Sequence, residues 1–457
     1  MNILMLPRYL KLTPFDNSTE QGRSDERYRL AAITVIANVI SRGIAMLVMV
    51  LTVSLTVPYL GAERFGVWMT IASFVGMLTF LDLGVGNALT NKVAQIASQN
   101  NPELLRNTIS GGLGFLFLLG CVMGLALMLL ASILPWQRLI KVADPALHDE
   151  VRNAVMLFAG LFGLYIFTNG IQRIFAGLQR AFEGHLVSAI GSIITLLALL
   201  VAVRQDAGIP VLLAITFGIQ SVSSLLLFYF LLKRRLFWFA SLVSNMRDES
   251  RNLLHVGGLF FLLQIGTMIG TGSDTLIISS QLGVIHVAAF AIVQKLFQFA
   301  TQPMYMMNAP LWAAYADAHA RDEKTFIRKT LNASLLHTGG YALVAVIILV
   351  IAGEYLVRIW TGNEIQISTS LLLAYGCWAI LEALGNALAM FLNGCGIVRQ
   401  QVINVIVFSV VSIPIKFFMI NNYGLVSMIV GEVMTYVTLT LIFYGLVYRK
   451  ALINVMR

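Results

Sequence analysis

Long uninterrupted runs of apolar residues recur along this 457-residue chain, and they constrain its fold more than any other feature. A run of roughly 20 apolar residues can cross the hydrocarbon core of a bilayer, about 30 Å thick, as an α-helix. The sequence therefore predicts an all-α integral membrane protein with about 12 transmembrane helices. The predicted spans are residues 31–59, 66–88, 108–134, 153–177, 186–203, 209–232, 253–280, 284–308, 331–353, 366–392, 400–419 and 423–447.

Composition and turn chemistry agree with this prediction. Charged residues make up only 12% of the chain, whereas a soluble domain is usually about a quarter charged. The alternating segments of roughly 10 residues that mark outer-membrane barrels are absent. Segments rich in Gly, Asn, Asp or Pro separate the apolar runs, and we expect turns there. These segments are LGAERFG, SQNNPELLRN, RQDAGIP, SQLG, WTGNE, NGCG and NNYG.

The placement of lysine and arginine predicts the orientation in the membrane. With the amino terminus in the cytoplasm, 21 of the 31 basic residues fall on the cytoplasmic side, 6 on the opposite side and 4 within spans. We therefore expect both termini in the cytoplasm. The first 30 residues hold only one short apolar run, ILML, which is too short for a signal-peptide core. The same bias explains much of the net charge of +9, so no nucleic-acid partner is expected.

The longest basic internal segment, KRRLFWFASLVSNMRDESRN, separates six predicted spans from six others. Because six is even, both halves would enter the membrane from the same side, as in transporters built from a parallel repeat. A short LG turn recurs after the first and the seventh span, in PYLGAERFGVW and SQLGVIHVAAF. The predicted organisation is a cytoplasmic tail over 1–30, a six-helix lobe over 31–235, a cytoplasmic linker over 236–251, a second six-helix lobe over 252–450 and a tail over 451–457.

Charged residues inside the predicted spans are the candidate functional residues, because such charges are costly and usually face a cavity or the bundle interior. They are Arg42, Asp82, Arg173, Asp274, Lys295, Glu382 and Glu432. Polar residues follow several of them at steps of three and four, which places the side chains on one helical face. The predicted polar faces are Gln264–Thr267–Thr271–Asp274, Lys295–Gln298–Gln302–Tyr305 and Tyr375–Trp378–Glu382–Asn386, with Asn38 beside Arg42. Together they predict a water-accessible central cavity.

Several of these charges also have a structural interpretation. Asp82 either tethers a neighbouring helix near the cytoplasmic end of its span or carries a coupled proton, which burial of a carboxyl group favours. Arg42 and Lys295 either line the cavity or form structural ion pairs, for example with Asp82 or Asp274. The sequence leaves both alternatives open.

Three further charges lie closer to the ends of their spans. Arg173 either faces the cavity or extends its side chain to the interface, and Glu432 either faces the cavity or is an ordinary interfacial residue. Lys416 lies near the far end of the span predicted over 400–419, and we expect its ammonium group to snorkel to the interface.

Two stretches carry a resemblance to a known family. FLDLGVGNALTNKVAQ, followed by NNPELLRNTISGG, resembles the second-helix signature of the polysaccharide-type lipid-linked oligosaccharide flippases. These proteins belong to the multidrug/oligosaccharidyl-lipid/polysaccharide exporter superfamily. VAAFAIVQKLFQFATQPMYMMNAPLWAAYADAHARDE is similar to the family's eighth-helix region. The resemblance covers nearly the whole chain and implies two six-helix lobes around a central cavity, working by alternating access.

The resemblance implies a flippase of the bacterial inner membrane. Such a protein moves an undecaprenyl-diphosphate-linked oligosaccharide, here an O-antigen or exopolysaccharide repeat unit, from the cytoplasmic to the outer leaflet. Family members for peptidoglycan precursors often carry two additional helices, for which this chain has no room. The implied partners are the lipid-linked glycan, membrane lipids and the polysaccharide polymerase machinery. No cofactor is expected apart from a proton or sodium gradient.

The chemistry of the headgroup assigns roles to the candidate residues. Diphosphate oxygens bind well to the forked guanidinium group of an arginine and to the point charge of a lysine. The residues expected to contact the headgroup are therefore Arg42, Lys295 and Arg173. The sugars would meet Asn38, Gln264, Gln298, Gln302, Trp378 and Asn386. Ion coupling or gating would fall to Asp82, Asp274, Glu382 and Glu432.

Two other functions compete with this interpretation. A multidrug or cation antiporter of the same superfamily would favour a cavity of carboxylates and aromatic rings, whereas basic groups accompany the acids here. A membrane glycosyltransferase or polymerase needs catalytic residues or a metal site on a sizeable loop. The longest predicted loops have about 20 residues, and the histidines and cysteines are dispersed, so we expect a transporter without a metal site.

Overall fold

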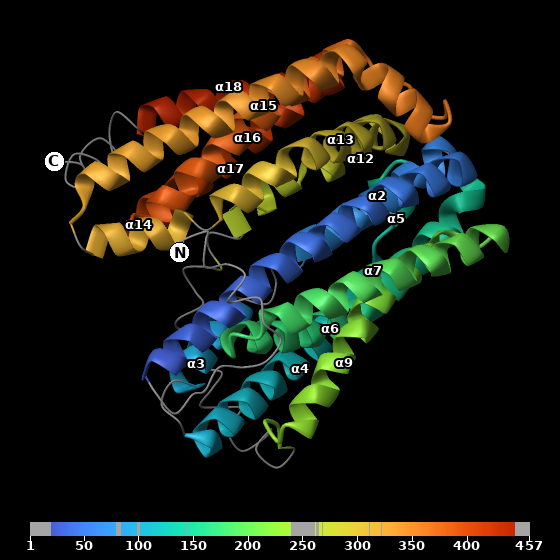
Figure 1. Ribbon diagram of the computed structural model, residues 1–457. Helices are drawn as coiled ribbons and strands as arrows, with labels where there is room; N and C mark the ends of the chain where they lie inside the picture. Colours follow the sequence, from blue (N-terminus) through green and yellow to red (C-terminus); the bar gives the residue numbers. More distant parts are fainter. Residues whose placement is uncertain are drawn as a thin grey trace. The chain divides into compact units, whose positions relative to one another are not determined.

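The computed structural model describes residues 20–78, 84–97, 101–142, 144–238, 261, 265–266, 268–309, 311–320 and 322–443. These residues are nearly all helical, and none of them lies in a β-strand (Figure 1). The chain divides into two compact units. The first combines the described parts of Met1–Leu55, Leu78–Trp136 and Asp149–Phe261, and the second those of Thr56–Met77, Gln137–His148 and Leu262–Arg457.

The first long helix, α2 (Glu20–Leu78), contributes to both units. The other helices of the first unit are α3 (Val85–Ala97), α4 (Pro102–Ile133), α6 (His148–Gly177), α7 (Ala181–Arg204), α8 (Ile209–Leu213), the π-helical turn η4 (Ala214–Gly218) and α9 (Ile219–Lys233). A short helix α5 (Trp136–Leu139) and a 3-10 turn η3 (Pro145–Leu147) lie before α6. The second unit contains the π-helical turn η5 (Met268–Gly272), α12 (Asp274–Leu282), α13 (Val284–Asn308), α14 (Leu311–Ala320), α15 (Lys324–Thr361), α16 (Thr369–Gly394), α17 (Val398–Tyr423) and α18 (Leu425–Phe443).

The prediction of an all-α membrane fold is confirmed. Ten helices within the described ranges are long and apolar enough to cross a membrane. The predicted first span lies in α2, whose helical backbone is interrupted at Gly61. The predicted second span, 66–88, lies in α2 as far as Leu78, and its residues 85–88 lie in α3. Residues 253–260, 262–264 and 267 of the predicted seventh span, 253–280, lie outside the described residues. The count of 12 therefore stays a prediction.

Glycines in the left-handed region mark the turns between helices. Gly61, Gly283, Gly362, Gly396 and Gly424 have positive φ, and each lies in a segment that the sequence predicts to be a turn. In the repeated LG motif, Gly61 has φ 68° and ψ 173°, and Gly283 has φ 92° and ψ 167°. An L-residue with a side chain avoids this conformation, so the same glycine-dependent turn occurs in both halves of the chain.

Pairs of long helices build the second unit, and aromatic rings fill its core. In Figure 1, α15 packs along α16 and α17 along α18, in orange to red. The Tyr375 ring lies edge-on to Phe290, with 5.7 Å between centroids, and Trp378 stacks on Phe408 at 6.4 Å. Such ring pairs add stabilisation beyond the area that they bury. This core fixes the helices that carry the site described below.

In the first unit, α4 and α6 approach each other closely at two glycines. A Cβ atom built on Gly163 would lie 2.7 Å from the carbonyl oxygen of Gly120, and one built on Gly120 would lie 2.5 Å from that of Gly163. Backbones can pack this closely only where both positions lack a side chain, as at small-residue interfaces between membrane helices.

Replacing Gly163 with alanine is expected to lower the melting temperature of the purified protein in detergent. The new methyl group meets main-chain atoms that cannot move aside, and overpacking of this kind costs roughly 1–3 kcal/mol. Gly43→Ala in α2 is the matched control, because a Cβ there meets nothing within 4 Å. Equal melting temperatures for the two variants would contradict the close α4–α6 contact.

Candidate functional site

A buried ionic cluster joins three helices of the second unit. Lys416 of α17 has no exposed surface, and its Nζ donates hydrogen bonds to Asp274 Oδ1 of α12 at 2.5 Å and to Glu432 Oε1 of α18 at 2.7 Å. A third bond, of 2.6 Å, goes to the main-chain oxygen of Gly270. An ammonium group has three N–H donors, so all of them are used. We call Asp274, Lys416 and Glu432 the buried ionic triad.

The π-helical turn η5 supplies the carbonyl group of Gly270. A π-helical turn breaks the regular i→i−4 hydrogen-bond pattern and often occurs at functional positions. Helix α17 holds this segment at two points: Ser409 donates a hydrogen bond to the Gly266 oxygen at 2.5 Å, and Lys416 donates to Gly270. Ser409 and Lys416 are seven residues apart, so they lie on one face of α17.

The prediction that Lys416 snorkels is wrong. Helix α17 continues to Tyr423, two turns beyond Lys416, and the Lys416 side chain has no exposed surface from which to reach an interface. Its ammonium group is paired with two carboxylates. The sequence held a signal for this pairing: Lys416 lies eight residues before the Gly424 turn, and Glu432 lies eight residues after it. Antiparallel helices joined by a tight turn bring such positions to the same level.

The predicted coupling carboxylates take different places. Asp274 and Glu432 are buried in the triad, with 6% and 1% of their surfaces exposed. Asp274 therefore pairs with Lys416, and not with Arg42 or Lys295. Glu432 is not an interfacial residue. Glu382 of α16 is exposed but acts electrostatically on Asp274. The fourth candidate, Asp82, lies outside the described residues. A coupling role for these residues stays a prediction.

In the first unit, Arg42 is an exposed cation on the membrane helix α2. Its Nε donates a hydrogen bond of 3.1 Å to Asn38 Oδ1, one turn earlier, so these two predicted binding residues do lie together. The positive charge of Arg42 acts electrostatically on His185 of α7. No carboxylate of the described residues pairs with Arg42. Its guanidinium retains donors for an anion.

Arg173 of α6 is half-buried. Its main-chain oxygen accepts a hydrogen bond of 3.1 Å from Thr90 Oγ1 of α3, and the neighbouring Gln172 donates one of 2.8 Å to Ser224 of α9. These bonds connect α6 to two helices. This part of α6 therefore has a structural role, whatever the Arg173 guanidinium binds.

The predicted polar face of α13 lies away from the hydrophobic core. Lys295 and Gln302 are half-buried and Gln298 is exposed, whereas Phe297 and Met304 on another face are buried. No described carboxylate forms an ion pair with Lys295. The stripe is thus available to a polar ligand, as a binding role requires.

The polar face predicted for α16 divides between core and helix contacts. Trp378 is 7% exposed and belongs to the aromatic core with Phe408. Asn386 Oδ1 accepts a hydrogen bond of 3.3 Å from Asn308 of α13. Gln264, the remaining predicted sugar contact, lies outside the described residues. Sugar contacts at these positions stay predictions.

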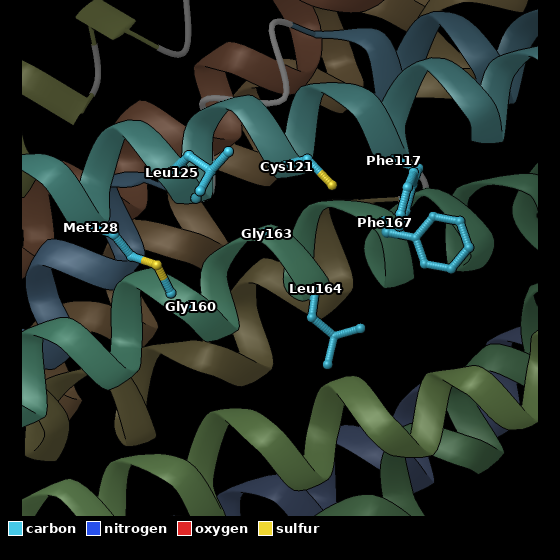
Figure 2. Close-up of a pocket in the computed structure, with 10 residues that line it drawn as sticks. Phe117, Cys121, Leu125, Met128, Gly160, Gly163, Leu164 and Phe167 are labelled. Carbon is cyan, nitrogen blue, oxygen red and sulfur yellow. The ribbon is translucent and has the colours of Figure 1, made fainter.

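An apolar groove of about 380 Å³ lies between α4 and α6, at the glycine contact described above (Figure 2). Its lining residues are Phe117, Gly120, Cys121, Gly124, Leu125, Met128, Gly160, Gly163, Leu164 and Phe167. Both helices can span a membrane, and the lining side chains offer no strong hydrogen-bond donor. The groove therefore suits hydrocarbon chains and not sugars.

Solved structures with the same fold are transporters. One is the inward-facing conformation of a multidrug resistance MATE family transporter of the MOP superfamily, with TM-score 0.75 and 16% identity, covering 91% of this chain and 99% of that one. Another is the lipid II flippase MurJ in an inward closed conformation, with TM-score 0.64 and 14% identity, covering 93% and 89%. At these identities the likeness shows the fold alone, which is that of a multi-pass helical membrane protein.

Sequence comparison identifies the family to which the chain belongs. The family model for "Polysaccharide biosynthesis protein" matches residues 29–312, more than half of the chain, so the chain belongs to that family. A second model, MatE, matches residues 260–418. A putative O-antigen export protein of Yersinia pseudotuberculosis is 19% identical over 409 residues, which is 87% of this chain and 90% of the relative. The family resemblance predicted from the two sequence stretches is confirmed.

Proposed function

We propose that this protein is a flippase for an undecaprenyl-diphosphate-linked oligosaccharide. It moves an O-antigen or exopolysaccharide repeat unit from the cytoplasmic to the outer leaflet of the bacterial inner membrane, by alternating access and coupled to a cation gradient. Both termini lie in the cytoplasm in this proposal. The lipid-linked glycan, membrane lipids and the polysaccharide polymerase machinery are its partners.

The observation that carries the proposal is the pair of membrane-helix cations without a described carboxylate partner, Arg42 and Lys295. A charge at this depth is costly unless a partner or water compensates for it. A diphosphate headgroup is such a partner, because it is strongly anionic and its oxygens match the donors of arginine and lysine. Organic cations, the substrates of the rival antiporter class, would be repelled by the same two groups.

The relatives support the glycan part of the proposal. The Yersinia relative is described as a putative O-antigen export protein, and one structural neighbour is a lipid II flippase. Both descriptions concern a glycan or a lipid-linked glycan precursor. The apolar groove of Figure 2 also fits a lipid-linked substrate, because a hydrocarbon chain needs only an apolar path.

Depletion of the protein from cells tests the proposal directly. We expect diphosphate-linked oligosaccharide to accumulate on the cytoplasmic face of the membrane, while surface glycan is lost. Mass spectrometry of the extracted lipid would also name the sugars. Normal surface glycan in depleted cells, together with hypersensitivity to cationic drugs, would instead support the multidrug antiporter.

A further inference from the structure

We infer that the buried ionic triad is a proton-binding site in which the ammonium group of Lys416 occupies the position that a free metal cation would take. This assignment deepens the gradient coupling proposed above by naming the ion and the groups that hold it. Its test measures proton and sodium binding to the purified protein and involves no glycan, so either proposal can fail without the other.

The first argument is the charge of the triad. Two ionised carboxylates and one ammonium group leave one excess negative charge in a cluster with almost no exposed surface. Within the described part of the chain, no second cation forms an ion pair with Asp274 or Glu432. An uncompensated charge in such surroundings costs several kcal/mol, by order of magnitude, and the usual remedy is a proton.

The second argument is the position of the two carboxyl groups. Asp274 and Glu432 both accept a hydrogen bond from the same Lys416 Nζ, so their carboxyl groups lie close together around one ammonium group. Two ionised carboxylates repel each other, whereas a pair that shares one proton forms a hydrogen bond. The arrangement of two carboxyl groups around one ammonium group therefore favours one proton on the pair Asp274 and Glu432.

The third argument excludes a free metal ion. Oxygen atoms of Asp274, Glu432 and Gly270 converge on one point, as the ligands of a hard cation do. Lys416 Nζ already occupies that point at 2.5 to 2.7 Å from each oxygen. A sodium ion would have to displace a positive charge that is covalently attached to α17.

The titratable neighbours increase the need for a proton. On α16, Glu382 adds negative charge near Asp274, and the Tyr375 hydroxyl interacts with all three carboxyl groups. Glu382 also acts electrostatically on Tyr436 of α18 and Tyr305 of α13. None of these four groups carries a positive charge. Proton uptake by the triad would weaken one carboxylate's attraction for Lys416 and so change how firmly α17 holds α12.

Charge-neutral substitutions test this inference. Glu432→Gln and Asp274→Asn each leave one carboxylate with Lys416, so each variant is expected to fold and to lose one protonated-carboxyl band from the infrared spectrum of the purified protein. The double variant leaves a buried ammonium group alone and is expected to have the lowest melting temperature of the three. Glu364→Gln, at an exposed position, is the matched control.

Sodium titration of the wild-type protein gives the second readout. We expect sodium and choline chloride at equal ionic strength to give the same melting temperature and the same infrared spectrum. A stabilisation specific to sodium would overturn the inference, as would an unchanged carboxyl band in both single variants. If neither single variant folds while the double variant does, the assignment of one proton and one ionised carboxylate to the triad is wrong.

Discussion

Replacing Lys416 with methionine is expected to destabilise the protein more than any other single substitution proposed above. The variant keeps the volume of the side chain but leaves the buried carboxyl pair of Asp274 and Glu432 without its cation. Removing one partner of a buried ion pair costs about 3–5 kcal/mol, because the remaining charge stays desolvated. The loss is expected to be largest at alkaline pH and smaller at acidic pH, where protons neutralise Asp274 and Glu432.

Thermal unfolding of the purified variant over a pH series measures this effect. Lys329→Met, at an exposed position of α15, is the matched control and is expected to unfold like the wild type. Methylammonium ions should restore part of the stability of Lys416→Met, because they can replace the missing ammonium group. A variant as stable as the control at alkaline pH would show that Lys416 does not neutralise the triad.

Replacing Arg42 or Lys295 with alanine is expected to reduce glycan export by roughly 10- to 100-fold. This range corresponds to the loss of hydrogen bonds to a charged group, about 1.5–3 kcal/mol, at about 1.4 kcal/mol for each factor of ten. The proteins should still insert and fold, since neither side chain pairs with a described carboxylate. Surface glycan, divided by the amount of protein in the membrane, is the quantity to measure.

Conservative variants separate headgroup binding from a general effect of charge. Arg42→Lys keeps the charge but loses the fork, so export is expected to fall between those of the wild type and Arg42→Ala. Arg204→Ala, at the exposed end of α7, removes a charge outside the proposed site and is expected to export normally. Normal export by both Arg42→Ala and Lys295→Ala would remove these residues from the headgroup role.

The membrane fold could be predicted from the sequence because its signals are local. Apolar runs give the helices, and glycines such as Gly283 and Gly424 give the turns between them. The turn predicted at LGAERFG is a bend at Gly61 within α2. The number of spans stays a prediction, because part of the predicted seventh span lies outside the described residues.

Predicting the site was harder because partners there come from distant segments. The sequence identifies Asp274 and Glu432 as charges inside predicted spans, whereas the position of Lys416 near a predicted span end favours snorkelling. Only the packing of α12, α17 and α18 shows that the three residues meet. Trp378 illustrates the opposite difficulty: helical spacing placed it on a polar face, whereas its ring lies in the aromatic core. Helical spacing shows which residues share one face of a helix. It does not show which other helix or cavity that face contacts.

Because α2 contributes to both units, a cut between the two halves of the chain does not separate the two units. Its residues up to Leu55 belong to one unit and Thr56–Met77 to the other, and Gln137–His148 also joins the second unit. A polypeptide cut in the central linker would therefore carry parts of the second unit on the amino-terminal fragment. The carboxy-terminal fragment would lack those parts of its unit, so it should accumulate in membranes only when the amino-terminal fragment is synthesised with it.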